Sequence, residues 1–397
     1  MKVKDALIGF SVGDALGVPI EFTHRNNDVN TYLKDMIGFG SHNVPAGTWS
    51  DDTSMTIATM DSLIQNNGIS LEDIMEKFVQ WLSMSKYTAT DKVFDIGNTT
   101  YKALHKYETN RDIKTCGSNE EWENGNGSLM RMLPIALYLY YNNFSAEKEV
   151  DIINSVSALT HAHEISVLGC NIYCDFIKQL LKNKGDYKLS YDFIINKDYS
   201  KYYSEQTINK YSRVLNGSII DLNMSDIKSS GYVIDTLEAS LWCVLNNDSY
   251  ENSVVQAINL GNDTDTIGAI TGSMCGIIYG LENIPERWIN SLKKINYLNE
   301  LSEKFETVVL GKKLEFTDNY SDKVSPSIST NVSYYLLNDS IIFMIDNDSM
   351  LFYRLNENNE WVLSNDLVSV FHDSVYNYVK VDSSYVASFI SQRSKKL

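Results

Sequence analysis

Cysteines are few in this sequence of 397 residues, long apolar runs are missing, and basic residues are outnumbered by acidic ones. The five cysteines are odd in number and form no CxxC pair, which fits a reducing cytoplasm better than a disulfide framework. No apolar stretch reaches the ~18–20 residues that span a bilayer, so we expect no membrane anchor. A net charge of −17 repels phosphate backbones and argues against nucleic-acid binding. These absences favour a soluble cytoplasmic protein.

Apolar residues recur at spacings of three and four through most of residues 1–312, which predicts helices. The segments with this spacing lie near 54–66, 71–84, 129–141, 150–181, 231–246, 251–259 and 266–281. The first 22 residues have the lysines and apolar run of a signal peptide, but Asp5 and Asp14 interrupt the run, so we expect a helix of the fold there. The Asn-rich connection 183–215 is long enough for an insertion or a mobile flap.

The character of the sequence changes after residue 312. Short runs rich in Tyr, Phe, Val and Ile follow one another with Asn and Asp between them, which predicts an antiparallel β meander. We therefore expect an all-α domain in residues 1–312, a linker in 313–330 and a small, mainly β domain in 331–397, to which the last 15 residues add a helix. This second domain contains no recognisable site. Its open roles are contact with a partner protein, dimerisation, and cover for an edge of the first domain.

Two segments carry a glycine at every fourth position. These glycines are Gly9, Gly13 and Gly17, and Gly268, Gly272, Gly276 and Gly280. On a helix they form a bare stripe, at a cost of roughly 1 kcal/mol per residue relative to Ala. Close approach of two helix backbones offsets that cost, whereas a flexible linker fits poorly with the interleaved Ile, Met and Ala. The pattern predicts two helices at the centre of the domain, with Asp14 and Glu21 close to the acidic residues near 263.

Two acidic clusters, WSDDTSMT with Asp51 and Asp52 and LGNDTDTIG with Asp263 and Asp265, precede apolar runs. Each is typical of a loop that enters the N-terminus of a buried helix. Neighbouring carboxylates repel one another unless a cation lies between them. Mg²⁺ and Mn²⁺ prefer oxygen ligands, whereas zinc prefers the His and Cys that both clusters lack. Because the two acids of each cluster point in different directions, two ions are favoured over one, although either cluster alone is also explained as a helix cap.

Six sequence blocks resemble the ADP-ribosylglycohydrolase family and occur in that family's order. They are GFSVGDALGVPIEF (9–22), GTWSDDTSMT (47–56), FDIGNTT (94–100), NGNGSLMRMLPIA (124–136), LTHAHEISVLG (159–169) and LGNDTDTIGAITGSMCGIIYG (260–280). The resemblance implies an all-helical fold over the first ~300 residues. It also implies a dinuclear Mg²⁺ or Mn²⁺ centre whose protein ligands are Ser50, Asp51, Asp52, Asp263, Asp265 and Thr266.

The same resemblance implies catalytic and substrate-binding residues. The catalytic residues are Glu21, on a mobile loop over the metals, with Asp52 and Asp263. The substrate-binding residues are Asp95, Gly125, Gly127, Ser128, Arg131 and His161, of which the glycine-rich loop suits a pyrophosphate through its N–H groups.

Structural alternatives exist for several of these residues. Glu21 is explained as a solvated charge, Asp95 as a helix N-cap and Arg131 as a partner of an acid. A metal-binding pair of His161 and His163 is a weak alternative, because a third soft ligand is missing.

The activity implied by the resemblance is hydrolysis of the bond between ADP-ribose and a protein side chain. The partner is then an ADP-ribosylated protein and the product is ADP-ribose. Immunity against an ADP-ribosylating toxin is one role that such a reaction serves. Two other functions stay open: hydrolysis of a free ADP-ribose derivative, and binding of ADP-ribose or a partner protein without catalysis. Against the last stands the fact that every acidic ligand position is filled.

Overall fold

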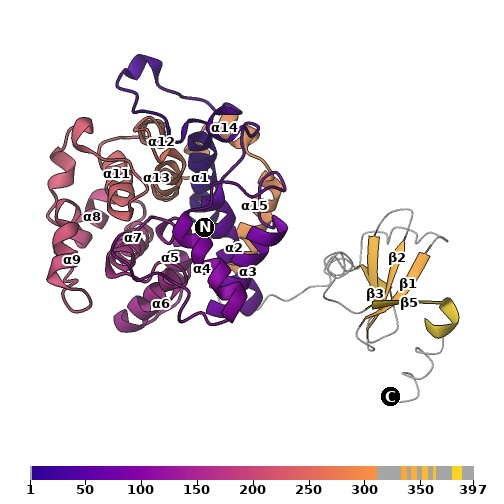
Figure 1. Cartoon of the computed structure of the whole chain (residues 1–397). Coiled ribbons are helices and arrows are strands. Elements are labelled where there is room, and N and C mark those ends of the chain that lie inside the picture. The colour runs from indigo at the N-terminus through magenta and orange to yellow at the C-terminus, as the bar shows by residue number, and fades with distance from the viewer. Residues whose placement is uncertain are drawn as a thin grey trace. The chain divides into compact units, whose positions relative to one another are not determined.

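The chain folds into a helical unit and a small antiparallel sheet (Figure 1). The structure is a computed structural model, and it describes residues 2–310, 332–337, 341–346, 351–355, 361–363 and 378–386. Two compact units divide the chain, residues 1–315 and 316–397. The expected linker 313–330 lies outside the described residues, so its bounds stay a prediction.

Helices make up the first unit. They are α1 (Lys2–Gly17), α2 (Asp51–Asn66), α3 (Leu71–Met84), α4 (Asn98–Asn110), α5 (Leu133–Tyr141), α6 (Ala146–Ala158), α7 (Glu164–Lys182), α8 (Tyr187–Asn196), α9 (Glu205–Lys210), α10 (Ser212–Leu215), α11 (Val233–Leu245), α12 (Tyr250–Ile258), α13 (Thr264–Tyr279), α14 (Glu286–Ser291) and α15 (Ile295–Val309). Short 3₁₀ turns include η1 (Val18–Ile20), η3 (Gly40–His42) and η4 (Leu129–Arg131). Within residues 2–310 the β pairing is limited to three isolated bridges, so the helical character expected from the apolar spacing is confirmed.

Two helices, α6 and α7, replace the single helix predicted near 150–181. The chain leaves the helical conformation at 159–163, and His163 begins α7 by accepting a hydrogen bond from the backbone N–H of Ile165. Ring nitrogens that accept in this way satisfy one of the free donors at a helix start. The apolar spacing continues through residues 159–163, so the spacing alone did not reveal the break between the two helices.

Segment 183–215 contains α8, α9 and α10. Asp186 and Ser204 cap the first two of these helices through their side-chain oxygens. Tyr191 and Tyr211 are buried against the rest of the unit. Segment 183–215, for which we expected an insertion or a mobile flap, therefore forms three helices. Mobility of this segment stays a prediction.

Helices α1 and α13 lie side by side through the middle of the unit (Figure 1), as the glycine stripes predicted. A Cβ added to Gly13 would lie 2.0 Å from the carbonyl oxygen of Gly268, and one added to Gly9 would lie 2.4 Å from that of Gly272. The backbones are therefore too close for any side chain at these positions. This approach brings Asp14, on α1, to the start of α13.

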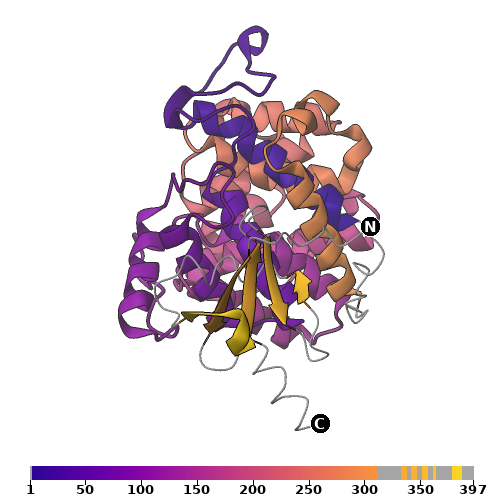
Figure 2. The same ribbon diagram turned by 90° about the vertical axis from the view of Figure 1, so that its right-hand side faces the viewer.

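The second unit contains a five-stranded sheet in the order β4-β3-β2-β1-β5. Figure 2 shows its strands in orange and yellow. The strands are β1 (Val332–Leu337), β2 (Ile341–Asp346), β3 (Leu351–Leu355), β4 (Trp361–Leu363) and β5 (Tyr378–Val381), and all neighbours pair antiparallel. The predicted meander is confirmed for β1 to β4, while β5 pairs with β1. Residues 383–386 are helical, and the rest of the predicted terminal helix lies outside the described residues.

Among the described residues, none of the helices has the length and apolar content needed to cross a bilayer.

Candidate metal centre and substrate pocket

The two acidic clusters meet at the N-termini of α2 and α13. Ser50 caps α2 by accepting from the backbone N–H of Asp52, and its hydroxyl lies 2.9 Å from the Asp52 carboxylate. Thr266, 214 residues later, donates its hydroxyl to the same carboxylate at 3.3 Å. Both helix N-termini direct their positive dipole ends at these acids, which favours negative charge there. The structure thus brings together the residues expected to hold the metals.

Several carboxylate oxygens in this cluster are buried without a hydrogen-bond partner. They are Oδ1 of Asp52, Oδ1 of Asp263 and both oxygens of Asp265. Burial, followed by the negative charge of neighbouring acids, raises the pKa of Asp52 and Asp265 well above its usual range. Buried polar atoms without partners are rare in native proteins unless an ion or water satisfies them. Oxygen-only donors at helix N-termini fit a hard divalent cation such as Mg²⁺ or Mn²⁺.

Two groups of donor atoms are close enough to hold an ion. One oxygen each from Asp14, Asp52 and Asp265 lie within 4.8 Å of one another, and so do oxygens from Glu21, Asp263 and Asp265. Asp265 belongs to both groups and has two free oxygens, so the pair suits a dinuclear centre.

Asp14 fixes the start of α2. Its carboxylate accepts from the backbone N–H of Ser50 at 2.9 Å, and from the backbone N–H and hydroxyl of Thr53 at 3.0 and 2.6 Å. Burial raises the pKa of Asp14 to about 6, although these hydrogen bonds act in the opposite direction. The sequence placed Asp14 near the clusters but gave it no role.

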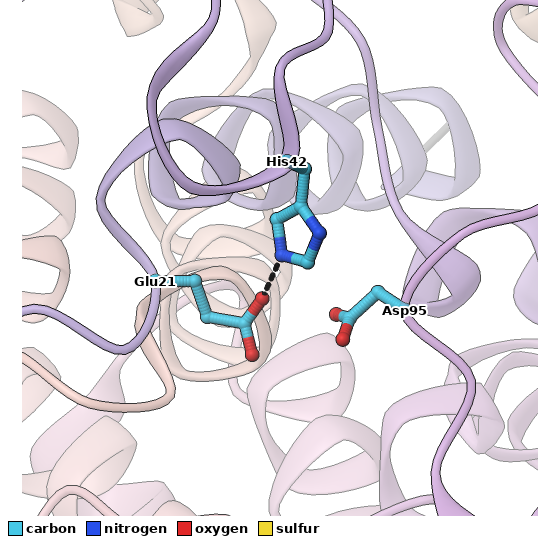
Figure 3. Close-up of side chains that lie close together, drawn as sticks. All are labelled: Glu21, His42 and Asp95. Atoms are coloured by element: carbon cyan, nitrogen blue, oxygen red, sulfur yellow. Dashed lines mark hydrogen bonds and ion pairs between the residues drawn. The ribbon is translucent and has the colours of Figure 1, made fainter.

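Glu21, His42 and Asp95 face one another at the edge of the cluster (Figure 3). Glu21 follows η1, and its carboxylate is hydrogen-bonded to Nε2 of His42. Burial, followed by the negative charges of Asp95 and Asp263, raises the pKa of Glu21 to about 11. Sequence reasoning missed His42, because a single histidine eight residues before the first cluster carries no motif.

A pocket of about 300 Å³ opens over these carboxylates. Its lining includes Glu21, Asp51, Asp95, Gly125, Gly127, His161, Asp263 and Thr266, all of them expected from the sequence. Another hollow, of about 770 Å³, lies between residues 20–37 and 258–261 and contains none of the expected residues. The smaller pocket is therefore the candidate substrate site.

The glycine-rich loop forms one wall of this pocket. Asn126 ties the loop to the metal cluster by donating to Oδ2 of Asp263 at 2.8 Å. A Cβ on Gly127 would lie 2.8 Å from the hydroxyl of Thr100 and 3.0 Å from Cε1 of His161, so the loop needs glycine there. Its backbone can consequently approach a ligand closely.

Ser128 and Arg131 do not line the pocket. Ser128 is fully buried and accepts a hydrogen bond from the hydroxyl of Ser157. Arg131 is also fully buried, and its guanidinium donates to the carbonyls of Gly127 and Val156. Both residues support the glycine-rich loop from the protein interior and not from the pocket. The predicted contact of Ser128 or Arg131 with a phosphate is untested, and their burial outside the pocket does not favour it.

The two histidines of the LTHAHEISVLG block have different positions. Burial, followed by the positive charge of Arg131, lowers the pKa of His161 to about 3, so the ring is neutral at physiological pH. Its Nδ1 lies 2.7 Å from the hydroxyl of Thr160. His163 caps α7 and contacts the amide of Asn124 through Nδ1, which accounts for it without a metal.

Comparison with known proteins gives the helical unit a clear set of relatives. A family model described as ADP-ribosylglycohydrolase matches residues 1–314. ADP-ribosylarginine hydrolase Tri1 of Serratia proteamaculans is 32% identical over 306 residues, which cover 76% of this chain and 78% of that protein. ADP-ribosyl-[dinitrogen reductase] glycohydrolase of Rhodospirillum rubrum is 27% identical over 295 residues, 73% and 90% of the two chains. A solved structure titled ADP-ribosylglycohydrolase-related protein complex matches with a TM-score of 0.64 and 25% identity, over 78% of this chain and 98% of that one.

Proposed function

The chain belongs to the ADP-ribosylglycohydrolase family, and we propose that it removes ADP-ribose from a modified protein side chain with two bound divalent cations. The observation that carries this proposal is the convergence of the two acidic clusters beneath the pocket, with buried carboxylate oxygens that have no protein partner. Family membership makes the protein a hydrolase of ADP-ribosyl bonds.

Arginine is the acceptor side chain that we propose. Relatives are named for ADP-ribosylarginine and for ADP-ribosyl-[dinitrogen reductase]. In this chain Glu21 and Asp95 line the pocket beside the proposed metal ligands, and carboxylates are the natural partners of a guanidinium. A serine acceptor would gain nothing from this concentration of negative charge.

The cations would be held by Ser50, Asp51, Asp52, Asp263, Asp265 and Thr266. When bound, the cations would bind the vicinal hydroxyls of the ribose and would lower the pKa of a water molecule. Glu21 lies beside Asp263 and Asp265, where its carboxylate would stabilise the positive charge that develops on the sugar or take a proton from the attacking water. The loop at Gly125 and Gly127 suits the pyrophosphate, with the neutral ring of His161 beside it.

Removal of one carboxylate ligand tests the proposal. Asp263→Asn should abolish release of ADP-ribose from an arginine-ADP-ribosylated protein, while the circular dichroism spectrum stays that of the wild type. Asp192→Asn, at an exposed position on α8, is the matched control and should keep full activity. EDTA should stop turnover, and Mg²⁺ or Mn²⁺ should restore it. Full activity of Asp263→Asn would refute the dinuclear proposal.

Product analysis separates the other functions. A hydrolase of free ADP-ribose derivatives would consume the nucleotide and spare the modified protein, and a binder would retain ADP-ribose without consuming the conjugate. A role in immunity is tested by co-expression with an arginine-specific ADP-ribosyltransferase toxin, in which the wild type should protect cells and Asp263→Asn should not.

A further inference from the structure

One nitrogen of His42 lies against the carboxylate of Glu21 (Figure 3). The two side chains are 13% and 5% exposed, so water competes little for this contact. The imidazole is flanked by the rings of Phe22 and Phe94, whose centroids lie 5.8 and 5.0 Å from its own. These two ring contacts restrict the orientations of the imidazole and favour its contact with Glu21.

Glu21, His42 and Asp95 also resemble a set of metal ligands, because one donor atom of each lies within 4.8 Å of the others. Nε2 of His42 and the carboxylate of Glu21 already satisfy each other without an ion. The buried oxygens without partners belong instead to the two acidic clusters. The contact is therefore best explained as a hydrogen bond.

Left-handed backbone conformations occur in the chain segments around this contact. Phe22 follows Glu21, Asn43 follows His42, and these two residues and Asp95 have φ values of 60°, 52° and 55°. Asn and Asp adopt this conformation readily, whereas a bulky residue such as Phe adopts it rarely. The conformation of Phe22 therefore indicates that the backbone next to Glu21 is held by its surroundings.

The turn η3 is built to bring His42 to Glu21. A Cβ on Gly40 would lie 1.9 Å from the carbonyl oxygen of Pro19, so the turn packs backbone to backbone on η1. The hydroxyl of Ser41 donates to the carbonyl oxygen of Glu21 at 2.5 Å. Both contacts hold the backbone next to Glu21, while His42 holds its side chain.

The neighbouring acids Asp95 and Asp263 repel the Glu21 carboxylate, whereas His42 can donate a hydrogen bond to it. We propose that His42 is a positioning residue: its Nε2–H donates to Oε2 of Glu21 and keeps Oε1 directed at the pocket where the ADP-ribosyl bond is cleaved. This inference rests on the proposed function. It predicts that loss of the N–H donor harms the chemical step more than it harms substrate binding.

The test compares His42→Leu with His42→Gln on an arginine-ADP-ribosylated protein. Leu removes the donor, whereas the Gln amide restores an N–H within similar reach. We expect His42→Leu to lower kcat by about 100-fold, the typical effect of a small misplacement of a reacting group. KM and the Mg²⁺ concentration for half-activation should stay within about threefold, because binding contacts are unchanged. His42→Gln should recover most of kcat.

Two comparisons exclude a merely structural effect. His105→Leu, on the exposed face of α4, is the matched control and should behave as the wild type. In a Glu21→Gln background, His42→Leu should cause no further loss, because residues that act as a unit are not additive. Wild-type kcat in His42→Leu, equal loss in His42→Leu and His42→Gln, or additive losses would each overturn the positioning role.

A spectroscopic measurement keeps this inference separate from the proposed function. In the metal-free protein labelled with ¹⁵N-histidine, the resonance that disappears in His42→Gln identifies His42 among six histidines. Its side-chain N–H signal should shift or vanish in Glu21→Ala and stay unchanged in Glu282→Ala, a control at an exposed position beyond the C-terminus of α13. An unchanged signal in Glu21→Ala overturns the pairing, whether or not the protein hydrolyses a conjugate. Failure of the wild type on every conjugate would refute the proposed function alone.

Discussion

Raising the pH of the metal-free protein from 5 to 8 should lower the free energy of unfolding of its helical unit. Burial raises the pKa of Asp14, Asp51, Asp52 and Asp265, and neighbouring acids raise the last three further. The folded protein therefore binds more protons than the unfolded chain. The resulting stability is fully present below the unfolded pKa near 4 and is lost as the pH rises through the folded pKa.

Asp14 gives the scale of this effect. Its pKa rises from 3.8 to about 6 on folding. At 1.36 kcal/mol for each factor of ten in proton affinity, this carboxyl alone accounts for about 3 kcal/mol between strongly acidic and neutral solution, and for about 1 kcal/mol of it between pH 5 and 8. The other three carboxyls and Glu21 act in the same direction, whereas His161, whose pKa falls on folding, acts in the opposite one. Because five carboxyls oppose one histidine, we expect a net loss that exceeds the value for Asp14.

Urea unfolding in EDTA, followed by tryptophan fluorescence, measures this loss. Five of the six tryptophans precede residue 311, so the signal reports mainly on the helical unit. Asp14→Asn should flatten the dependence on pH by about 1 kcal/mol across the range, whatever its effect on absolute stability. The exposed variant Asp192→Asn should keep the wild-type slope.

Excess Mg²⁺ should reverse the trend with pH. The cation binds the ionised carboxylates, so its affinity and its contribution to stability grow as protons leave. A concentration of 100 times the dissociation constant adds about 2.7 kcal/mol. Two results would contradict this reasoning: metal-free protein that is at least as stable at pH 8 as at pH 5, or an Asp14→Asn variant with the wild-type slope. Either would show that ionisation of the buried acids does not lower the free energy of unfolding.

Two further predictions concern the helix pair and the pocket. Gly13→Ala should destabilise the helical unit by about 1–3 kcal/mol or more, because the new Cβ would lie 2.0 Å from the carbonyl oxygen of Gly268. Gly68→Ala, whose Cβ meets a nearest atom at 3.6 Å, is the control, and equal melting temperatures for both variants would contradict the packing argument. With a pKa of about 3, His161 should stay neutral above pH 5, so the acidic limb of the kcat/KM profile should be the same in the wild type and His161→Gln. A shift of that limb in the variant would show that His161 titrates during turnover.

Regular spacing made the helical core predictable, and the chemistry of acids made the convergence of the two acidic clusters predictable. The glycine stripes pointed to the contact between α1 and α13 because nothing else offsets so many glycines in a helix. The convergence of Asp52 and Asp263 was predictable because uncompensated carboxylates are too costly to bury apart from a cation. Both conclusions depend on patterns that are local along the chain.

Side-chain directions and the packing of loops were not predictable. The motif placed Ser128 and Arg131 in the right loop, but a motif does not give the direction of a side chain, and both turn away from the pocket. His42 reaches Glu21 only because η3 packs on η1, a contact that leaves no spacing in the sequence. Helices α8 to α10 escaped prediction because Asn, Lys and Tyr dilute their apolar positions.

Helix packing and the arrangement of the acidic residues are linked in this chain, because neighbouring residues determine them. The bare face of Gly13 allows α1 to approach α13, and Asp14, the next residue, reaches across to the first turn of α2. A larger residue at position 13 would separate the helices that carry Asp14 and Asp265, two of the carboxylates that lie within 4.8 Å of one another and of Asp52. The glycines destabilise their helices, but they allow the close approach that brings the acids together. The acids repel one another, and a bound cation would relieve that repulsion.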